Sequence, residues 1–409
     1  MKVNYLKSLF LVSTFIFCFS CSSDDDSNGG VVKMTPGKIQ LSDVEKTMVG
    51  ENNNFGVHLF THSLSLNCKG AVCSPVDASV TMGMLANGLQ GKSLRRQLEI
   101  MHMENHALSS VNYFYAKLLT NAPLLDEQVT LAMAHGIYGS ATDSVYFNPQ
   151  YIDCQTNYYQ ADVQTIDFSK AGSRQKATDW LKLHSNGMNV YWQNENHGTL
   201  LLGSFVNFGA KWRLTSANAE RREVDFTAVK GGHKQSVKMT VGDFASVDYT
   251  DNERLQAVNL PLGQGKYNML IFMPQEGATE IDYLMWEMND TRMKQLLAAM
   301  QKRNVHMELP DISQENDVDL IGHGDEYVEI FAGFADFDPM LQNDCRNANV
   351  RVAKPFKEQV RLNISAEVTA GDAMGESPRQ SFVANRPFGY IVYEKDTGII
   401  FFIGMYYGQ

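Results

Sequence analysis

The sequence predicts a single large α+β domain that runs from about residue 44 to residue 409. Helical and strand-like apolar patterns both occur, but they do not alternate regularly, as they would in a parallel α/β sheet. No internal repeat and no internal linker interrupts them. With 409 residues, of which 44% are apolar, the chain can bury one sizeable core.

The first twenty residues are expected to be a signal peptide rather than part of this domain. Two lysines precede an apolar run, Leu9–Phe19, which is too short to span a bilayer comfortably. The small residue directly before Cys21 resembles the lipobox of bacterial lipoproteins, in which this cysteine is acylated and becomes the first residue of the mature chain. The acidic run at 23–26 resembles the signal that sends such proteins to the outer face of the outer membrane in some bacteria.

Residues 21–43 are expected to form a flexible acidic tether, because Ser, Asp, Gly and Asn cannot bury enough apolar surface to order themselves. We therefore expect an exported, surface-exposed outer-membrane lipoprotein that meets the membrane only through a lipid on Cys21. The alternative is a plain signal peptide with an acidic linker. The net charge of −11 is spread along the chain without a basic stripe, so nucleic acid is not expected as a partner.

The N-terminal half of the domain contains three helical and two strand-like patterns. Apolar residues at helical spacing begin at Val44, and Ser74 before Pro75 is a start signal for the second helix. Apolar runs and alternation predict the strands. The expected helices are 44–66, 74–89 and 148–159, and the expected strands are 131–140 and 161–168.

The C-terminal half is mostly strand-like after one helix. A buried strand is expected to end at Trp212, and a closing hairpin turns at Lys395–Gly398. The expected helix is 175–183, and the expected strands are 201–212, 255–262, 267–275, 387–394 and 399–406.

No catalytic constellation is found, so we expect no enzymatic activity, cofactor or metal. The chain lacks a GxSxG elbow, a phosphate-binding GK[ST] loop and an HExxH pair. His102 and His106 have the i,i+4 spacing of a metal site on a helix, but no third ligand is evident and two solvated histidines are expected. His135, in an apolar strand, is expected to be a satisfied core residue.

The mature chain keeps too few cysteines for a disulfide scaffold. Cys68 and Cys73 are close enough in sequence to form a bridge, yet Cys73 lies in an apolar run where a buried free thiol is equally plausible. Cys154 and Cys345 have no evident partner.

Seven segments occur in the order of the landmarks of the serpins, a family of suicide protease inhibitors, and cover nearly the whole mature domain. The resemblance implies a serpin fold with three β-sheets, about nine helices and an exposed reactive-centre loop, and it places Trp212 near the top of the central sheet. We expect a monomer. The segments are CSPVDASVTMGMLANGLQGKS, YYQADVQTIDFS, ATDWLKLHSNGM, FGAKW, YNMLIFMPQEG, VHMELPDI and RPFGYIVYEKDTGIIFFIGMY.

The resemblance implies inhibition of serine, or in some cases cysteine, endopeptidases. A protease would cleave the loop as a substrate, and the freed segment would enter the central sheet as a new strand. The segment rich in small residues before the final hairpin would be the hinge, weakly anchored until cleavage. The hinge residues implied are Val368, Thr369, Ala370, Gly371, Asp372 and Ala373, with Thr369 in place of the small hinge threonine.

The primary-pocket residue is expected to be Arg379, so that a trypsin-like protease would cut the Arg379–Gln380 bond. Met374 and Glu376 are the other candidates. Arg379 could instead only solvate an exposed turn.

Several positions depart from the family pattern. Ala366 replaces an acidic residue, Val368 a glycine, and the loop is about half a dozen residues short of the usual length. Ser74 is retained beneath the sheet, but Asp77, Ser204 and Glu358 stand where the family has Ser, Asn and His. Paired acids there need protonation or separate partners. A non-inhibitory surface lipoprotein, acting as a binding or structural module on the same fold, is therefore the alternative.

Overall fold

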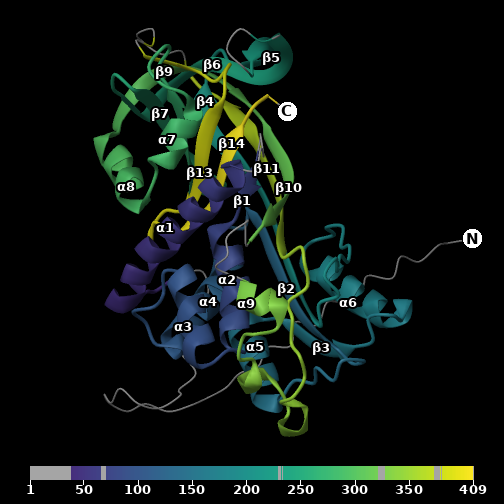
Figure 1. Ribbon diagram of the computed structural model, residues 1–409. Helices are drawn as coiled ribbons and strands as arrows, with labels where there is room; N and C mark the ends of the chain where they lie inside the picture. Colours follow the sequence, from purple (N-terminus) through teal and green to yellow (C-terminus); the bar gives the residue numbers. More distant parts are fainter. Residues whose placement is uncertain are drawn as a thin grey trace, which may run out of the picture. The chain divides into compact units, whose positions relative to one another are not determined.

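The computed structural model describes residues 38–65, 71–228, 232, 234–320, 328–372, 378 and 380–408. Within these residues nine α-helices combine with 14 strands that belong to one hydrogen-bonded network (Figure 1). This arrangement confirms the α+β prediction. The expected signal peptide, most of the expected tether and Cys21 lie outside the described residues.

The helices begin where local signals place them. Helix α2 (Pro75–Ala86) has Pro75 at its first turn, and the Ser74 side chain accepts a hydrogen bond from the Asp77 backbone N–H, as the start signal predicts. All twelve of its residues are buried. The other helices are α1 (Asp43–Ser65), α3 (Gly91–Ile100), α4 (Leu108–Asn121), α5 (Pro149–Tyr159), α6 (Ala171–His184), α7 (Ile281–Trp286), α8 (Asp290–Ala299) and α9 (Val328–Ala332).

Five strands form the first of three strand groups, in the order β3-β2-β4-β11-β10. Strands β4 and β11 are parallel to each other, whereas β4 is antiparallel to β2 and β11 is antiparallel to β10. The prediction that β4 ends at Trp212 is wrong, because the strand continues to Ser216. The bounds are β2 (Thr130–Ser140), β3 (Asp162–Ile166), β4 (Leu200–Ser216), β10 (Ile312–Asp319) and β11 (Lys357–Ala370).

The remaining strands form two further groups, in line with the expected three sheets. The order β1-β14-β13-β8-β7 makes the second group, and β5-β6-β9-β12 makes the third. Strand β6 joins them by pairing with both β7 and β9, and Trp212 of β4 pairs with Leu262 of β7. The bounds are β1 (Val72–Cys73), β5 (Glu220–Thr227), β6 (Lys234–Asp251), β7 (Leu255–Leu262), β8 (Tyr267–Pro274), β9 (Gln301–Pro310), β12 (Gln380–Val383), β13 (Phe388–Glu394) and β14 (Ile400–Tyr406).

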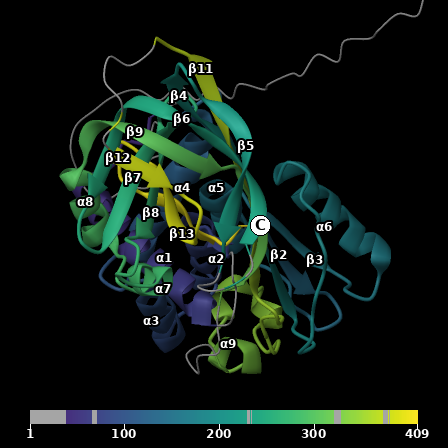
Figure 2. The ribbon, with the colours of Figure 1, turned by 90° about the horizontal axis from the view of Figure 1, so that it is seen from above.

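Helices pack on the five-stranded group in two separate cores. Helix α2 belongs to the main core with the central strands. Helix α6 lies beside β2 and β3 (Figure 2), where Leu181 packs with Tyr138 and Phe205 in a second, smaller core. Because the strands are held from both sides, any separation of β4 from β11 exposes a packed interior.

Candidate functional site

The candidate site is the boundary between β4 and β11, which we call the seam. The two strands pair directly over thirteen residues, from Ser204 opposite Glu358 to Ser216 opposite Ala370, with no strand between them. Figure 1 shows β4, β11 and β10 running lengthwise beside one another. The five-stranded group is therefore closed.

Trp212 lies towards the end of the seam that is nearer the hinge. Its residue is 1% exposed, its backbone is opposite Ala366, and its ring meets Phe244 edge-on at 6.0 Å between ring centroids. The indole Nε1 is buried without a hydrogen-bond partner. A buried donor without a partner costs about 1–3 kcal/mol, so this end of the seam is less well satisfied than its interior.

The hinge is anchored more firmly than the sequence suggests. Val368, Thr369 and Ala370 belong to β11 and pair with β4, so the expectation of weak anchoring is wrong for these three residues. The reason is the extension of β4 past Trp212, which supplies backbone partners. The Gly371 N–H also donates to the Ser216 carbonyl oxygen at 3.2 Å. Asp372 is exposed, and Ala373 lies outside the described residues.

Side chains on the outer face reinforce this end of the seam, and we call them the clasp. One Arg213 nitrogen lies 3.1 Å from each Glu367 carboxylate oxygen, and the hydrogen bond holds the pKa of Glu367 below its usual value. Lys211 lies 3.5 Å from the same carboxylate. The Thr215 and Thr369 hydroxyls are 3.2 Å apart.

The clasp is a modest barrier to opening. Arg213 and Glu367 are 37% and 35% exposed, and exposed ion pairs contribute about 0–1 kcal/mol. The clasp was not identified from the sequence. The available signal is the alternation of polar residues at 211, 213 and 215 on one strand and at 367 and 369 on the other.

A buried acid cluster lies at the opposite end of the seam. Asp77 Oδ1 is 2.7 Å from His135 Nε2, and Asp77 Oδ2 accepts a hydrogen bond from Ser204 Oγ at 2.6 Å. Ser204 Oγ in turn accepts from Thr81 Oγ1 at 2.9 Å. All four residues are at most 2% exposed. The prediction that His135 is a satisfied core residue is confirmed, and His135 is the separate partner that Asp77 requires.

Glu358 is the second acid of the cluster, and its carboxyl group is accommodated differently from that of Asp77. It is fully buried, and Oε2 accepts a hydrogen bond from the Ser74 backbone N–H at 3.0 Å. Its Oε1 has no hydrogen-bond partner. Burial, and then the neighbouring charge of Asp77, raise the pKa of Glu358 well above its ordinary value. The neutral acid is therefore the favoured form in the closed seam.

This arrangement predicts how stability depends on pH. Glu358 keeps its proton in the folded state above the pKa of 4.5 that it has in the unfolded chain, so its contribution is fully present below pH 4.5 and is lost as pH rises through the folded pKa. Glu358→Gln retains the shape but cannot ionise. We expect the variant to be clearly more stable than the native chain at pH 8, where the native carboxyl is driven to ionise, and to gain much less at pH 5.

Thermal unfolding midpoints of the uncleaved chain at the two pH values measure this effect. Glu315→Gln is the control, because Glu315 is 57% exposed and pairs with Arg361 on the outer face of the same strand group. An equal loss of stability in Glu358→Gln at both pH values would contradict the protonated state.

Of the other predicted site residues and cysteines, some lie within the residues that the structure describes and some lie outside them. Gln380 is the first residue of β12 and lies opposite Val305 of β9. Cys73 is a buried free thiol, as one of the two readings of the sequence expected. Cys68, Met374, Glu376 and Arg379 lie outside the described residues.

The comparisons with known proteins agree on one family. The family description "Serpin (serine protease inhibitor)" matches residues 50–408. The chain is 23% identical to Serpin B3 of Homo sapiens, over 87% of this chain and 97% of that protein. It is 22% identical to a serpin-like protein of Thermococcus kodakarensis, over 88% of this chain and 85% of that protein.

The fold is likewise shared with solved structures. The native state of the thermophilic serpin tengpin aligns with a TM-score of 0.75 at 19% identity, over 92% of this chain and 98% of tengpin. The family match spans residues 50–408 and the fold is that of solved serpins, so the chain belongs to the serpin family.

Proposed function

We propose that this chain is a suicide-substrate inhibitor of serine endopeptidases that works by inserting its hinge segment into the seam. Serpin membership supports protease inhibition at the family level, with a protease as partner and no catalytic turnover by the serpin itself. The observation that carries the proposal for this chain is that the hinge continues the very strand, β11, that borders the closed seam.

The direction of the strands favours insertion. A segment that turns back within the hinge runs antiparallel to β11, and therefore antiparallel to β4 as well, because β4 and β11 are parallel. Insertion would replace one parallel pairing by two antiparallel pairings. Antiparallel pairing is slightly more stable per residue, so the exchange is favourable once the chain is cut and free to move.

The proposed chemistry follows from a single cut in the loop. The protease serine attacks the Arg379 carbonyl carbon, the Arg379–Gln380 amide bond breaks, and the new amine of Gln380 leaves with a proton. The protease is then held by an ester bond to Arg379. Insertion of the preceding residues would carry it along the seam before water hydrolyses the ester.

The length of the segment limits how far the protease travels. Gly371 to Arg379 comprises about nine residues, or roughly 30 Å when extended. The thirteen pairs of the seam span about 40 Å. The protease would thus move about two-thirds of the way along the seam.

Incubation with trypsin tests this proposal. We expect a covalent complex that survives denaturing electrophoresis and has the summed mass of trypsin and the chain up to Arg379, together with a released fragment that begins at Gln380. Mass spectrometry of both products identifies the bond. Cleavage at Met374 or Glu376 would remove Arg379 from the site, and cleavage without any complex would support the alternative function below.

The alternative is a non-inhibitory serpin-fold surface protein. It is favoured by the pairing of Val368–Ala370 with β4 and by the clasp, both of which must break before a strand can enter. Gln380 of β12 also pairs with Val305 of β9, so this pairing must open before a protease can bind the Arg379–Gln380 bond. In that case the loop is a protease substrate, or is not cut, and the fold acts as a binding or structural module.

We further propose that the chain is a lipoprotein, held at the outer face of the outer membrane through Cys21. No helix among the described residues is long and apolar enough to cross a membrane. The support is the lipobox-like sequence at Ser20-Cys21 with the acidic run behind it.

Replacing Cys21 by Ala is expected to abolish membrane retention, because the thiol that would carry the lipid is removed. The variant should appear in the soluble fraction or as an uncleaved precursor on gels of fractionated cells. Normal processing with unchanged membrane association would contradict the lipid anchor.

A further inference from the structure

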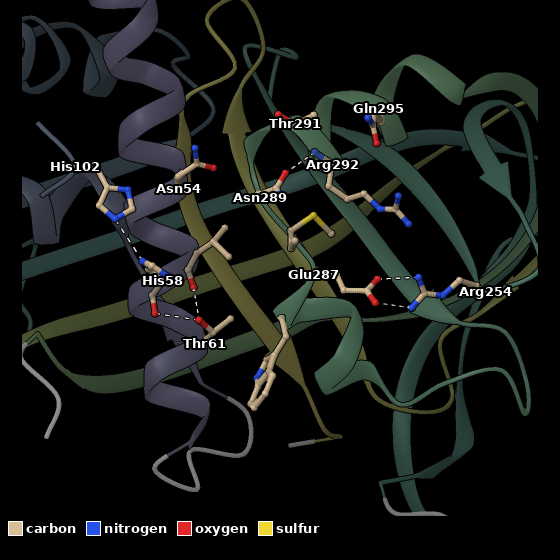
Figure 3. Close-up of a pocket in the computed structure, with 13 residues that line it drawn as sticks. Asn54, His58, Thr61, His102, Arg254, Glu287, Asn289, Thr291, Arg292 and Gln295 are labelled. Carbon is tan, nitrogen blue, oxygen red and sulfur yellow. Dashed lines mark hydrogen bonds and ion pairs between the residues drawn. The ribbon is translucent and has the colours of Figure 1, made fainter. Parts of the chain in front are cut away.

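A cavity of about 920 Å³ lies away from the seam, between α1, the turn after α3, and the α7–α8 region (Figure 3). Its walls are mostly polar or charged. In Figure 3, His58 of α1 and His102 of the turn face one another on one wall, and Arg254, Glu287 and Arg292 lie on the other. Nothing in the proposed inhibitory mechanism uses these residues.

The two histidines meet through ring nitrogens. His58 Nδ1 lies 3.4 Å from His102 Nε2, and the rings are nearly perpendicular at 80°. His102 has φ of +58°, the left-handed region, directly after the C-cap of α3. Glycine is the usual residue at such a position, because a side chain is disfavoured in the left-handed region. The fold thus tolerates local strain to hold this imidazole against α1.

We propose that His58 and His102 together bind a divalent transition-metal ion such as Zn²⁺. Two zinc–nitrogen bonds of about 2.0–2.1 Å at a tetrahedral angle place the two nitrogens about 3.4 Å apart. The separation of His58 Nδ1 and His102 Nε2 is therefore the one that a shared ion requires.

The electrostatics of the wall favour a cation at this point. The carboxylates of Glu51 and Glu104 act on His102 and place negative charge near the ion. Across the cavity, Arg254 is neutralised by Glu287 at 2.8 Å.

The remaining coordination positions are open to the cavity. Among the residues that the structure describes, no group of three or more His, Cys, Asp or Glu side chains has a metal-holding arrangement, so solvent completes the site. Imidazole nitrogens suit Zn²⁺, Cu²⁺ and Ni²⁺. An open two-histidine site can exchange its water for a small anion from the cavity, where Arg292 lines the far wall.

The pair that the sequence spacing suggested is a different one. His106 lies 2.5 Å from Glu51 through its Nε2, and its side chain is only 10% exposed, so the expectation of two solvated histidines is wrong. Residues 101–106 form turns rather than a helix, which removes the i,i+4 geometry. His102 therefore finds its partner on α1.

Calorimetric titration of the full mature chain with ZnSO₄ at pH 7.5 tests the site. We expect one zinc per chain, with affinity at least tenfold lower in His58→Gln and in His102→Asn. Asparagine accepts the left-handed backbone at position 102, so this variant removes the ligand without adding strain. His184→Gln, which alters an exposed histidine on α6, should leave binding unchanged.

His106→Gln separates the two possible pairs. Retained zinc binding in this variant supports His58 and His102, whereas its loss would assign the ion to the His102–His106 pair. Absence of binding to the native chain, or binding that both His58→Gln and His102→Asn leave intact, would show that the two imidazoles share only a hydrogen bond and would overturn the proposal. Thermal unfolding of each variant establishes that it is folded.

Discussion

Cleavage of the reactive-centre loop is expected to raise the thermal unfolding midpoint by roughly 10 °C or more. The freed segment of about nine residues gains backbone hydrogen bonds on both sides when it enters the seam. At about 1 kcal/mol for each bond the gain is on the order of 10 kcal/mol. The unfolding entropy of about 370 residues is roughly 0.8 kcal/mol/K. Dividing the gain in free energy by this entropy gives the expected rise in the unfolding midpoint.

The measurement is a pair of thermal scans on the intact chain and on the chain cut at Arg379, with the cleavage fragments retained. A midpoint that stays the same or falls would mean that the segment remains outside the seam, which is the behaviour of the non-inhibitory alternative. A segment of about nine residues covers the hinge end of the seam, so the Ser204–Glu358 pair at the far end can remain closed in the cleaved chain.

Thr369→Arg is expected to turn an inhibitor into a substrate. In the closed seam Thr369 is exposed on the outer face of β11, so the intact variant should fold with an almost unchanged midpoint. Insertion requires the hinge to leave its pairing with β4 and Thr369 to enter the seam with the cleaved segment. A long cationic side chain at this position must then be desolvated without a partner, at a cost of several kcal/mol. Each 1.4 kcal/mol is about a factor of ten, so the yield of trapped protease should fall about 100-fold or more.

The yield of covalent complex per cleaved loop measures how often cleavage leads to a trapped protease and how often to a released one. Cleavage itself should proceed at a similar rate in the variant, because the protease meets the loop before insertion begins. Asn363→Arg is the matched control: it places the same charge on the outer face of the same strand, but below the segment that would move. Undiminished trapping by Thr369→Arg would exclude insertion through this hinge.

The predictions from sequence succeeded where local chemistry specifies the element. The Ser74-Pro75 start signal of α2, the apolar strands β7 and β8, and the turn between β13 and β14 all lie within a residue or two of their expected places. Each of these features depends on neighbouring residues, through a cap, a buried run or a tight turn. The order of the family landmarks along the chain then predicted the serpin fold.

Longer strands with mixed surfaces were missed. Strand β6 alternates exposed and half-buried residues at its start and pairs with strands of two different groups, β7 and β9. From the sequence, β4 was predicted to end at Trp212, although Arg213, Leu214 and Thr215 continue the strand. Exposed polar residues carry little apolar periodicity, so their strand conformation depends on a partner that is distant in sequence.

From the sequence alone came the α+β class, the order of the family landmarks, the residues proposed to form the hinge, and the unusual acids Asp77 and Glu358. Only the tertiary structure decided how those residues are satisfied. It places Thr369 beside Thr215, 154 residues earlier, and so anchors a segment that looks unattached in sequence. It places His135 of β2 beside Asp77 and buries Glu358 where the protonated carboxyl is favoured. It also brings together His58 and His102, which are 44 residues apart in sequence. The physical reason is that strand register, burial and charge pairing act between residues that are close only after folding, and no local pattern encodes that distance.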